Sequence, residues 1–372
     1  MRFVNASYQR LEIPDANDKS AVYQHLERIG RVCYKSEDKI TDDSAIHYLE
    51  TVRNSRHWAM LEHFIFVMSI SAEDYDSIQN AAAEFPTDFN LHNKLKFIDA
   101  TKQEGVFRGE DVLKKYLVSG SATSFNYLWE CKSMMDNPDH VIVKICEFLN
   151  SKFPDIMRVP DGYELQHSPR TNYFYLLKRE EIESLPRYLR MIHDSMSVTY
   201  VTNLGVSHDM VRSRPASWAM ESTRWVNYSK KCGYTYTIPL WFSPEERELL
   251  LNEDYLNDFI ATGNPDPRLS STTQDWVRHL KAVETTYDYF AKEFGYRQDQ
   301  ISLLLPKNFK TELTMTARLA EWKHFFFLRV DKRVRPDMLT IVGPLFKECL
   351  ERDPEIYDDQ TDLLQYLEYI PK

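Results

Sequence analysis

The sequence predicts an α+β fold, with a mixed sheet flanked by helices and a large helical insertion. Of its 372 residues, 43% are hydrophobic and 13% aromatic, with 10 Gly, which favours a well-packed, helix-rich globule. The runs "HFIFVMSIS" (63–71) and "VTYVTN" (198–203) have the apolar or alternating pattern of strands. We expect one domain over residues 1–372, with the helical insertion at 72–190 and an acidic tail at 351–372.

Amphipathic helical spacing recurs along the rest of the chain. The segments with this spacing are 18–35, 43–54, 216–228, 244–262, 273–294 and 312–330, and a further helix is expected after Pro336. In the segment 216–228, which follows Pro215, a helix would place Trp218, Ser222 and Trp225 on one face.

Composition excludes several classes of protein. The net charge of −10 argues against a broad nucleic-acid surface. The chain has no apolar run of the roughly 18–20 residues that a membrane span needs, and its N-terminus lacks a signal-peptide pattern, so we expect a cytoplasmic protein. It has no zinc-protease, P-loop or dinucleotide motif, and we expect no metal site. The cysteines form no CxxC pair and are expected to be reduced: Cys33, Cys131, Cys146, Cys232 and Cys349.

The segment "VRSRPASWAMESTRW" (211–225) concentrates three arginines in an acidic protein. Arg212 and Arg214 would precede a helix N-terminus, whose unpaired N–H groups and dipole attract anions, and guanidinium forks bind phosphate. In the alternative interpretation, Glu221 and Arg224 form a surface ion pair while the tryptophans pack in the core. The composition of the segment leaves both interpretations open.

The block "LGVSHDMVRSRPASWAMESTRWVNYSK" (204–230) resembles the signature of the flavin-dependent thymidylate synthases (the ThyX family), which reads Arg-His-Arg, seven residues, then Ser. Other blocks resemble the same family in the same order. They are "RVCYKSEDKITDDSA" (31–45), "RHWAMLEHFIF" (56–66), "YLVSGSATSFNYLW" (116–129) and "LLLPKNFKTELTMTARLAEWKHFFFLR" (303–329).

The resemblance implies an α+β fold and homotetramers with active sites between subunits. It implies methylation of dUMP at C5 with carbon from 5,10-methylenetetrahydrofolate and reducing equivalents from NADPH through FAD. Arg329 would be catalytic, facing the uracil and favouring ionisation at N3, which makes C5 nucleophilic. The residues implied for dUMP are Arg212, Glu221, Ser222, Thr223, Arg224 and Arg329. Those implied for FAD are His63, Arg212, Ser213, Arg214, Arg318 and His324, the last two from across a subunit interface.

The chain departs from the family pattern at several of these positions. The middle His of the signature is Ser213, an expected Arg is Ser302, and an expected Asn-Leu-Arg is "RLA" at 318–320. Likewise "VRPDM" (334–338) stands for "AHPQM", and "SGSATSF" (119–125) for "SGNxRAW". Three hypotheses therefore remain: a divergent thymidylate synthase, an enzyme that modifies C5 of another pyrimidine nucleotide (dCMP, UMP, or by hydroxymethyl transfer), or a non-catalytic nucleotide-binding relative that has lost flavin.

Overall fold

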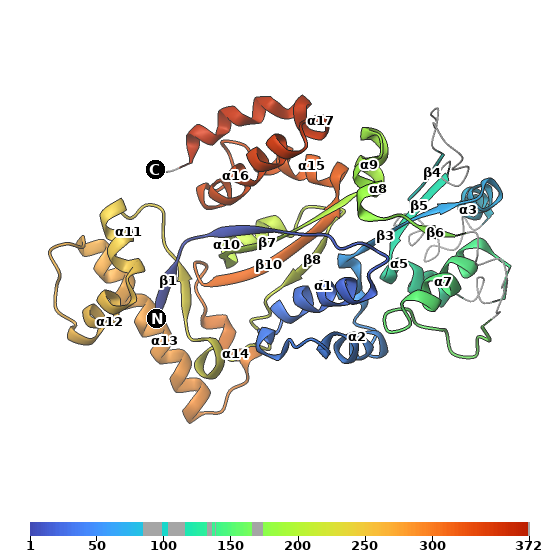
Figure 1. The fold of residues 1–372 in the computed structure, drawn as a ribbon. Helices are drawn as coiled ribbons and strands as arrows, with labels where there is room; N and C mark the ends of the chain where they lie inside the picture. The colour runs from blue at the N-terminus through green and yellow to red at the C-terminus, as the bar shows by residue number, and fades with distance from the viewer. Residues whose placement is uncertain (85–98, 103–115, 132–135, 138, 166–173, 371–372) are drawn as a thin grey trace.

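The computed structural model describes residues 1–84, 99–102, 116–131, 136–137, 139–165 and 174–370. Two four-stranded sheets organise the described part of the chain (Figure 1). The central sheet has the order β2 (Ser7–Leu11), β7 (Ser195–Asn203), β10 (Lys310–Arg318), β8 (Ser217–Met220). The second sheet has the order β4 (Asp99–Lys102), β5 (Tyr116–Ser121), β3 (Ile65–Ile70), β6 (Tyr175–Leu176). The predicted α+β class is confirmed.

We expected one sheet that mixes parallel and antiparallel strands. In the structure the two kinds of pairing occur in different sheets. Every strand pair in the two four-stranded sheets is antiparallel. Among the described strands, parallel pairing is confined to β1 (Arg2–Val4) and β9 (Thr235–Thr237). The longest pairing joins β7 to β10 over nine residues, from Lys310 opposite Asn203 to Arg318 opposite Ser195.

The alternation of side chains along β7 and β10 gives the central sheet two different faces. One face is apolar and packs against α15 (Leu319–Arg329) and α16 (Pro336–Arg352). Its strand residues are Met196, Val198, Tyr200, Leu313, Met315 and Ala317. The other face carries hydroxyl pairs, because the intervening residues are Ser or Thr: Ser197 with Thr316 at 2.7 Å, and Thr199 with Thr314 at 2.8 Å.

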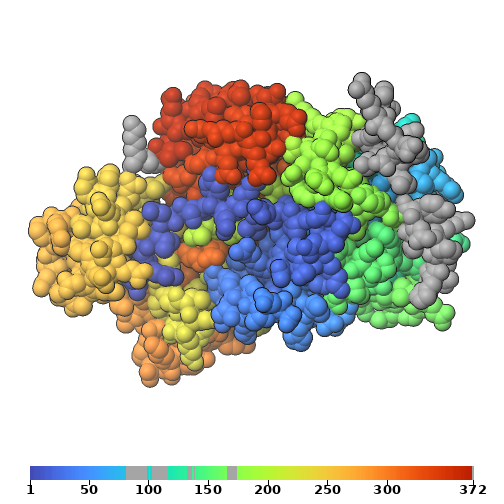
Figure 2. Space-filling model, viewed as in Figure 1, coloured from blue at the N-terminus to red at the C-terminus, as the bar shows by residue number. Residues whose placement is uncertain are grey.

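The remaining helices gather around these sheets in three groups. Near β8 and β10 lie α1 (Lys19–Val32), the 3-10 helix η2 (Trp58–His63), α2 (Ser44–Asn54) and α10 (Leu204–Met210). A separate lobe, on the left in Figures 1 and 2, contains α11 (Pro244–Leu251), α12 (Glu253–Thr262), α13 (Ser271–Glu293) and α14 (Gln298–Ile301). Around the second sheet lie α3 (Ala72–Glu84), α5 (Ala122–Trp129), α7 (Val141–Lys152), α8 (Arg179–Glu183) and α9 (Arg187–His193). Among the described residues, no helix combines the length and apolar character of a membrane span.

Of two helices predicted from sequence, one is wrong and the other is wrong in its first half. Residues 216–228 do not form a helix: Ser217–Met220 is the edge strand β8, paired with β10, and a turn follows. Residues 312–330 contain the end of β10 and then α15, which begins at Leu319. In both places strand pairing overrides local helical spacing, and the alternation "LTMTA" (313–317) is the signal for a strand.

The segment 72–190, predicted to be a helical insertion, also contains strands β4, β5 and β6. These strands pair with β3, which precedes the segment, so the segment shares a sheet and a core with the N-terminal part of the chain. The predicted acidic tail is folded over 354–370: α17 (Pro354–Tyr357) and the 3-10 helix η7 (Asp358–Tyr369) pack on α16. At Gly343 in α16, an added Cβ would lie 2.6 Å from Leu367 Cδ2, so a larger residue here would displace the Leu367 side chain.

Three buried histidines stand where the sheets and helices meet. His193 bonds Ser119 of β5 through Nδ1 at 2.8 Å and Thr101 of β4 through Nε2 at 2.6 Å. His63 bonds Thr316 through Nδ1, and His25 bonds the His63 carbonyl. Burial lowers the pKa of His63 and His193 to about 3 and that of His25 to about 4. All three are therefore neutral in the folded protein.

Acid should destabilise the fold through these histidines. The unfolded chain binds a proton on each below pH about 6.5, whereas the folded chain does so only near pH 3 to 4, so stability falls as pH falls through this window. From pH 6.5 to 5 we expect a loss of up to about 2 kcal/mol per histidine. Chemical denaturation at several pH values measures the free energy of unfolding as a function of pH. His193→Asn should show a shallower pH slope, and an unchanged slope would contradict the role of His193.

Two aromatic residues of α15 offer a matched test of the core. Trp322 is fully buried and donates from Nε1 to the Met196 carbonyl at 2.9 Å, whereas Phe327 is 62% exposed. Trp322→Ala should lower the free energy of unfolding by about 3–5 kcal/mol because it leaves a cavity. Phe327→Ala should change it by less than about 0.5 kcal/mol in the monomer. Equal effects of the two substitutions would show that this packing is misassigned.

Candidate functional site

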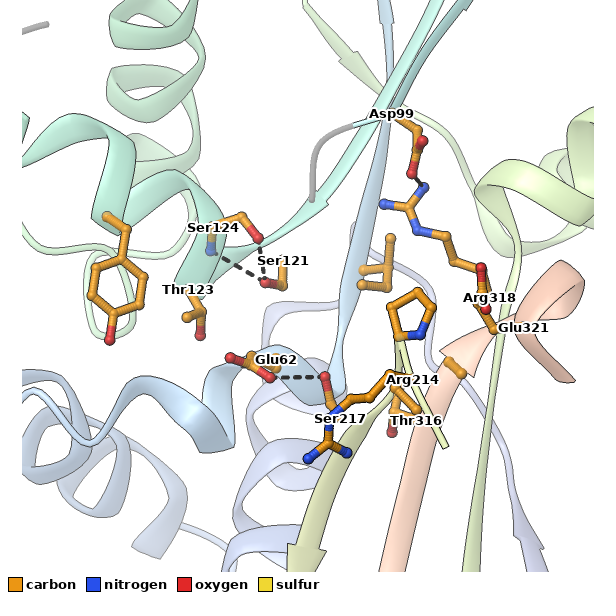
Figure 3. A pocket seen from close by; sticks show the side chains of 15 residues that line it. Glu62, Asp99, Ser121, Thr123, Ser124, Arg214, Ser217, Thr316, Arg318 and Glu321 are labelled. Atoms are coloured by element: carbon orange, nitrogen blue, oxygen red, sulfur yellow. Dashed lines mark hydrogen bonds and ion pairs between the residues drawn. The ribbon is translucent and has the colours of Figure 1, made fainter. Parts of the chain in front are cut away.

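A cavity of about 510 Å³ lies at the junction of the two sheets (Figure 3). The second sheet and its flanking helices contribute one wall, and the central sheet with the start of α15 contributes the other. The polar lining residues are Glu62, Asp99, Ser121, Thr123, Ser124, Tyr127, Arg214, Ser217, Thr316, Arg318 and Glu321. Apolar surface comes from Ile65, Pro215, Ala216 and Ala317. The size lies within the roughly 300–1,000 Å³ range of small-molecule sites.

Two contacts bridge the walls of this cavity (Figure 3). Ser217 at the start of β8 donates to Glu62 Oε2 at 2.9 Å. Arg318 at the end of β10 forms an ion pair with Asp99 and donates to Ser119 Oγ at 3.1 Å. Burial raises the pKa of Asp99, and the charge of Arg318 partly opposes that rise. Each bridge therefore joins a carboxylate of one wall to a donor of the other.

His63 stands behind the wall that Thr316 forms. Its Nδ1 lies 2.8 Å from Thr316 Oγ1, which in turn bonds Ser197. The side chain is fully buried, and its Nε2 has no hydrogen-bond partner among the described residues. A neutral imidazole with one free nitrogen can donate or accept one further bond.

Arg329, at the end of α15, contacts the arginine-rich segment 211–225 and the helix before it. Its Nη2 donates to the Asp209 carbonyl at 2.7 Å and to Ser213 Oγ at 3.2 Å, and its buried Nε has no partner among the described residues. Burial lowers the pKa of Arg329, and the charge of Arg212 lowers it further, while Asp209 opposes this. An arginine keeps its charge despite such shifts.

The remaining predicted nucleotide residues lie beyond the other end of β8. Glu221 is 3% exposed and is engaged by neighbouring side chains. Ser222 and Thr223 are half-buried on the turn that follows, and Arg224 is exposed, with its guanidinium 5.4 Å from the Trp225 ring centre. The predicted surface ion pair of Glu221 with Arg224 does not form, because Glu221 points into the protein instead.

In a single chain the predicted site residues therefore form separate groups. Arg214 and Arg318 line the cavity, and His63 lies behind its wall. Arg212, Ser213 and Arg329 cluster at one end of β8, and residues 221–224 follow its other end. His324 is exposed on α15 and does not line the cavity.

Sequence reasoning did not identify the carboxylates and hydroxyls of the cavity. Glu62 precedes the predicted flavin residue His63, and Ser121 caps α5 by accepting from the Ser124 N–H at 3.2 Å. Alternation of hydroxyl and apolar residues in β10 could have indicated Thr316. Asp99 carries no such signal, because its role depends on contact with Arg318 from a distant part of the chain.

Four of the five cysteines lack the setting of an activated nucleophile. Cys33, Cys146 and Cys349 are buried, and burial raises the pKa of each. At Cys232, burial also raises the pKa, although Lys35, Lys231 and Lys310 oppose the rise. A thiol held in its protonated form is a poor nucleophile.

A family model described as "Thymidylate synthase complementing protein" matches residues 135–355, which is more than half of the chain. The match includes the arginine segment, β10 and α15. The second sheet strands β3, β4 and β5, with His63, lie before it.

Curated relatives agree with this match. The chain is 24% identical over 191 residues to a protein named flavin-dependent thymidylate synthase from Pyrococcus furiosus, and 26% identical over 192 residues to one from Pyrococcus horikoshii. Each alignment covers 49% of this chain and 68% of the relative.

Two crystal structures of the Helicobacter pylori enzyme, both with FAD and dUMP, align at 14% identity with TM-scores of 0.34 and 0.32. They cover 50% and 58% of this chain, and 88% and 93% of that one. The match of the family model over residues 135–355 shows that the chain belongs to the family of flavin-dependent thymidylate synthases.

Proposed function

We propose that this protein is a flavin-dependent thymidylate synthase, which methylates dUMP at C5 with methylenetetrahydrofolate, FAD and NADPH. The observation that carries the proposal is the contact of Arg329 with Ser213, 3.2 Å between Nη2 and Oγ. This contact joins the two family-like blocks through residues 116 positions apart in sequence, and Arg212, next to Ser213, is near enough for its charge to lower the pKa of Arg329.

Several features of the cavity between the sheets support FAD as its ligand. Apolar surface from Ile65, Pro215 and Ala317 suits a ring system, hydroxyls can bond its edge, and Arg214 supplies positive charge for a diphosphate, whereas Arg318 is paired with Asp99. His63, behind the wall, has a free nitrogen. When bound, FAD would carry reducing equivalents from NADPH to the nucleotide.

Arg329 would act on the uracil by charge. A fixed guanidinium favours negative charge on the ring, which makes C5 nucleophilic without a cysteine. The bonds to Asp209 and Ser213 hold this guanidinium before substrate arrives, so little reorganisation is needed. Ser222, Thr223 and Arg224 would hold the nucleotide phosphate by charge-assisted bonds.

The separation of these groups along β8 supports a site shared between subunits of a homotetramer. Residues 212–213 precede the four-residue strand β8 and residues 221–224 follow it, and in a shared site each group would face a different subunit. Phe327 and Leu328 expose apolar side chains on α15, next to Arg329. Burying such side chains against another subunit is favourable.

Flavin content and C5 exchange test this function directly. The purified protein, incubated with FAD, should show flavin absorbance and release hydrogen from C5 of labelled dUMP faster than from dCMP or UMP. Preference for another nucleotide would indicate a different C5 activity. A protein that binds no FAD and releases no label would contradict the enzymatic proposal.

Arg329→Ala should reduce turnover by about 100-fold or more, because it removes the group that stabilises developing charge. The fold should persist, since Arg329 is half-buried at a helix end. Steady-state kinetics measures the turnover, and circular dichroism measures whether the fold persists. Arg333→Ala is the matched control, because that side chain is 84% exposed and pairs with Asp331. A variant at position 329 with near-normal turnover would remove Arg329 from catalysis.

Arg224→Ala should weaken dUMP binding by about 10- to 100-fold, as loss of a charge-assisted hydrogen bond costs about 1.5–3 kcal/mol. FAD affinity should stay within about twofold, because Arg224 lies away from the cavity. Calorimetric titration with each ligand measures the two effects. Arg268→Ala, at an exposed arginine paired with Asp266, controls for general loss of charge. Unchanged dUMP affinity at Arg224→Ala would refute the assignment.

A further inference from the structure

A buried carboxylate lies directly before the turn that carries Ser222, Thr223 and Arg224. Glu221 is 3% exposed, and both of its oxygens are engaged. Oε1 accepts from Tyr228 OH at 2.9 Å, and Oε2 accepts from Lys310 Nζ at 2.9 Å and from the Glu312 backbone N–H at 3.2 Å. A carboxylate enclosed in this way does not reach a ligand on the surface of the turn.

Two lysines neutralise this buried charge. Lys310 on β10 contacts Glu221 and also Glu312 Oε1 at 2.5 Å. Lys35, just after α1, lies 2.7 Å from Glu312 Oε1 and 3.9 Å from Glu221 Oε2. Both lysine side chains are little exposed, 12–13%, so solvent screens the network weakly. Removing one partner would leave a buried charge without adequate compensation.

The network closes the turn at both of its ends. Glu221 precedes the turn and Tyr228 follows it, so their 2.9 Å hydrogen bond joins the two ends of the loop. Within it, the Ser222 N–H donates to the Cys33 carbonyl at 2.8 Å, and the Ser222 carbonyl accepts from the N–H groups of Trp225 and Val226. The backbone that presents Ser222, Thr223 and Arg224 is thereby tied to β10 and to the end of α1.

We infer that Glu221 is a positioning residue, held by Lys310 and Lys35, which fixes the 222–224 turn for nucleotide binding and does not itself touch the nucleotide. The inference about the turn stands on this geometry. Its consequence for nucleotide affinity rests on the proposed function. Because the network acts before substrate arrives, it lowers the ordering cost of binding and should affect KM more than kcat.

Lys310→Met tests the inference, since it removes the charge that holds Glu221 and keeps the length of the side chain. We expect the KM for dUMP to rise about 10-fold or more, with kcat and FAD affinity within about twofold. Lys310→Arg, which keeps the charge, should restore most of the affinity. Lys307→Met is the matched control, because Lys307 lies three residues earlier and contacts His208 instead of the network.

Hydrogen exchange of the 222–228 backbone gives a second readout that needs no activity. Lys310→Met should speed exchange there about 10-fold or more and leave β7 unchanged. If the variant does not fold, Tyr228→Phe, which opens only the loop-closing bond, takes its place. Unchanged exchange and unchanged KM, or Lys310→Arg behaving like Lys310→Met, would overturn the inference. Faster exchange in a protein that binds no dUMP would support the positioning role and refute the proposed function.

Discussion

The pairing of β7 with β10 is the interaction on which the rest of the structure depends. Nine residues pair in register, and because side chains alternate along each strand, this one ladder builds two surfaces. The apolar surface holds α15 and α16 and so fixes Arg329 at the end of α15. The hydroxyl surface gives Thr316 to the cavity, and Arg318 follows in the same alternation. A shift of register by one residue would exchange the two surfaces.

The cavity exists because a second sheet meets the first through polar contacts. Ser217 with Glu62 and Arg318 with Asp99 bridge the junction, and neutral histidines fill the space behind it. Such a junction leaves room for a ligand, whereas an apolar interface of the same size would close by packing. It also places charged groups where water is partly excluded, so that each of them acts more strongly on a bound molecule than it would in solvent.

The short strand β8 divides the family-like block 204–230 into two groups of predicted site residues, one before the strand and one after it. Before the strand, Ser213 is close to Arg329; after it, Glu221 is buried, Ser222 and Thr223 are half-buried, and Arg224 is exposed. A four-residue strand keeps these ends apart in one chain. In the proposed homotetramer, a second subunit would supply the complementary half of the nucleotide site. The exposed apolar side chains of α15 are suited to that contact.

The sequence by itself determined the α+β class and the helices whose apolar spacing is strong, such as 18–35 and 273–294. The block 204–230 also indicated the family to which the chain belongs. Although the alternation at 313–317 indicates a strand, the sequence did not determine that 217–220 is its partner, because this pairing joins residues about a hundred positions apart and outweighs local helical spacing. Nor did it show that Glu221 points inward or that Asp99 meets Arg318. Those features depend on which distant groups compensate a buried charge, and only the tertiary structure decides that.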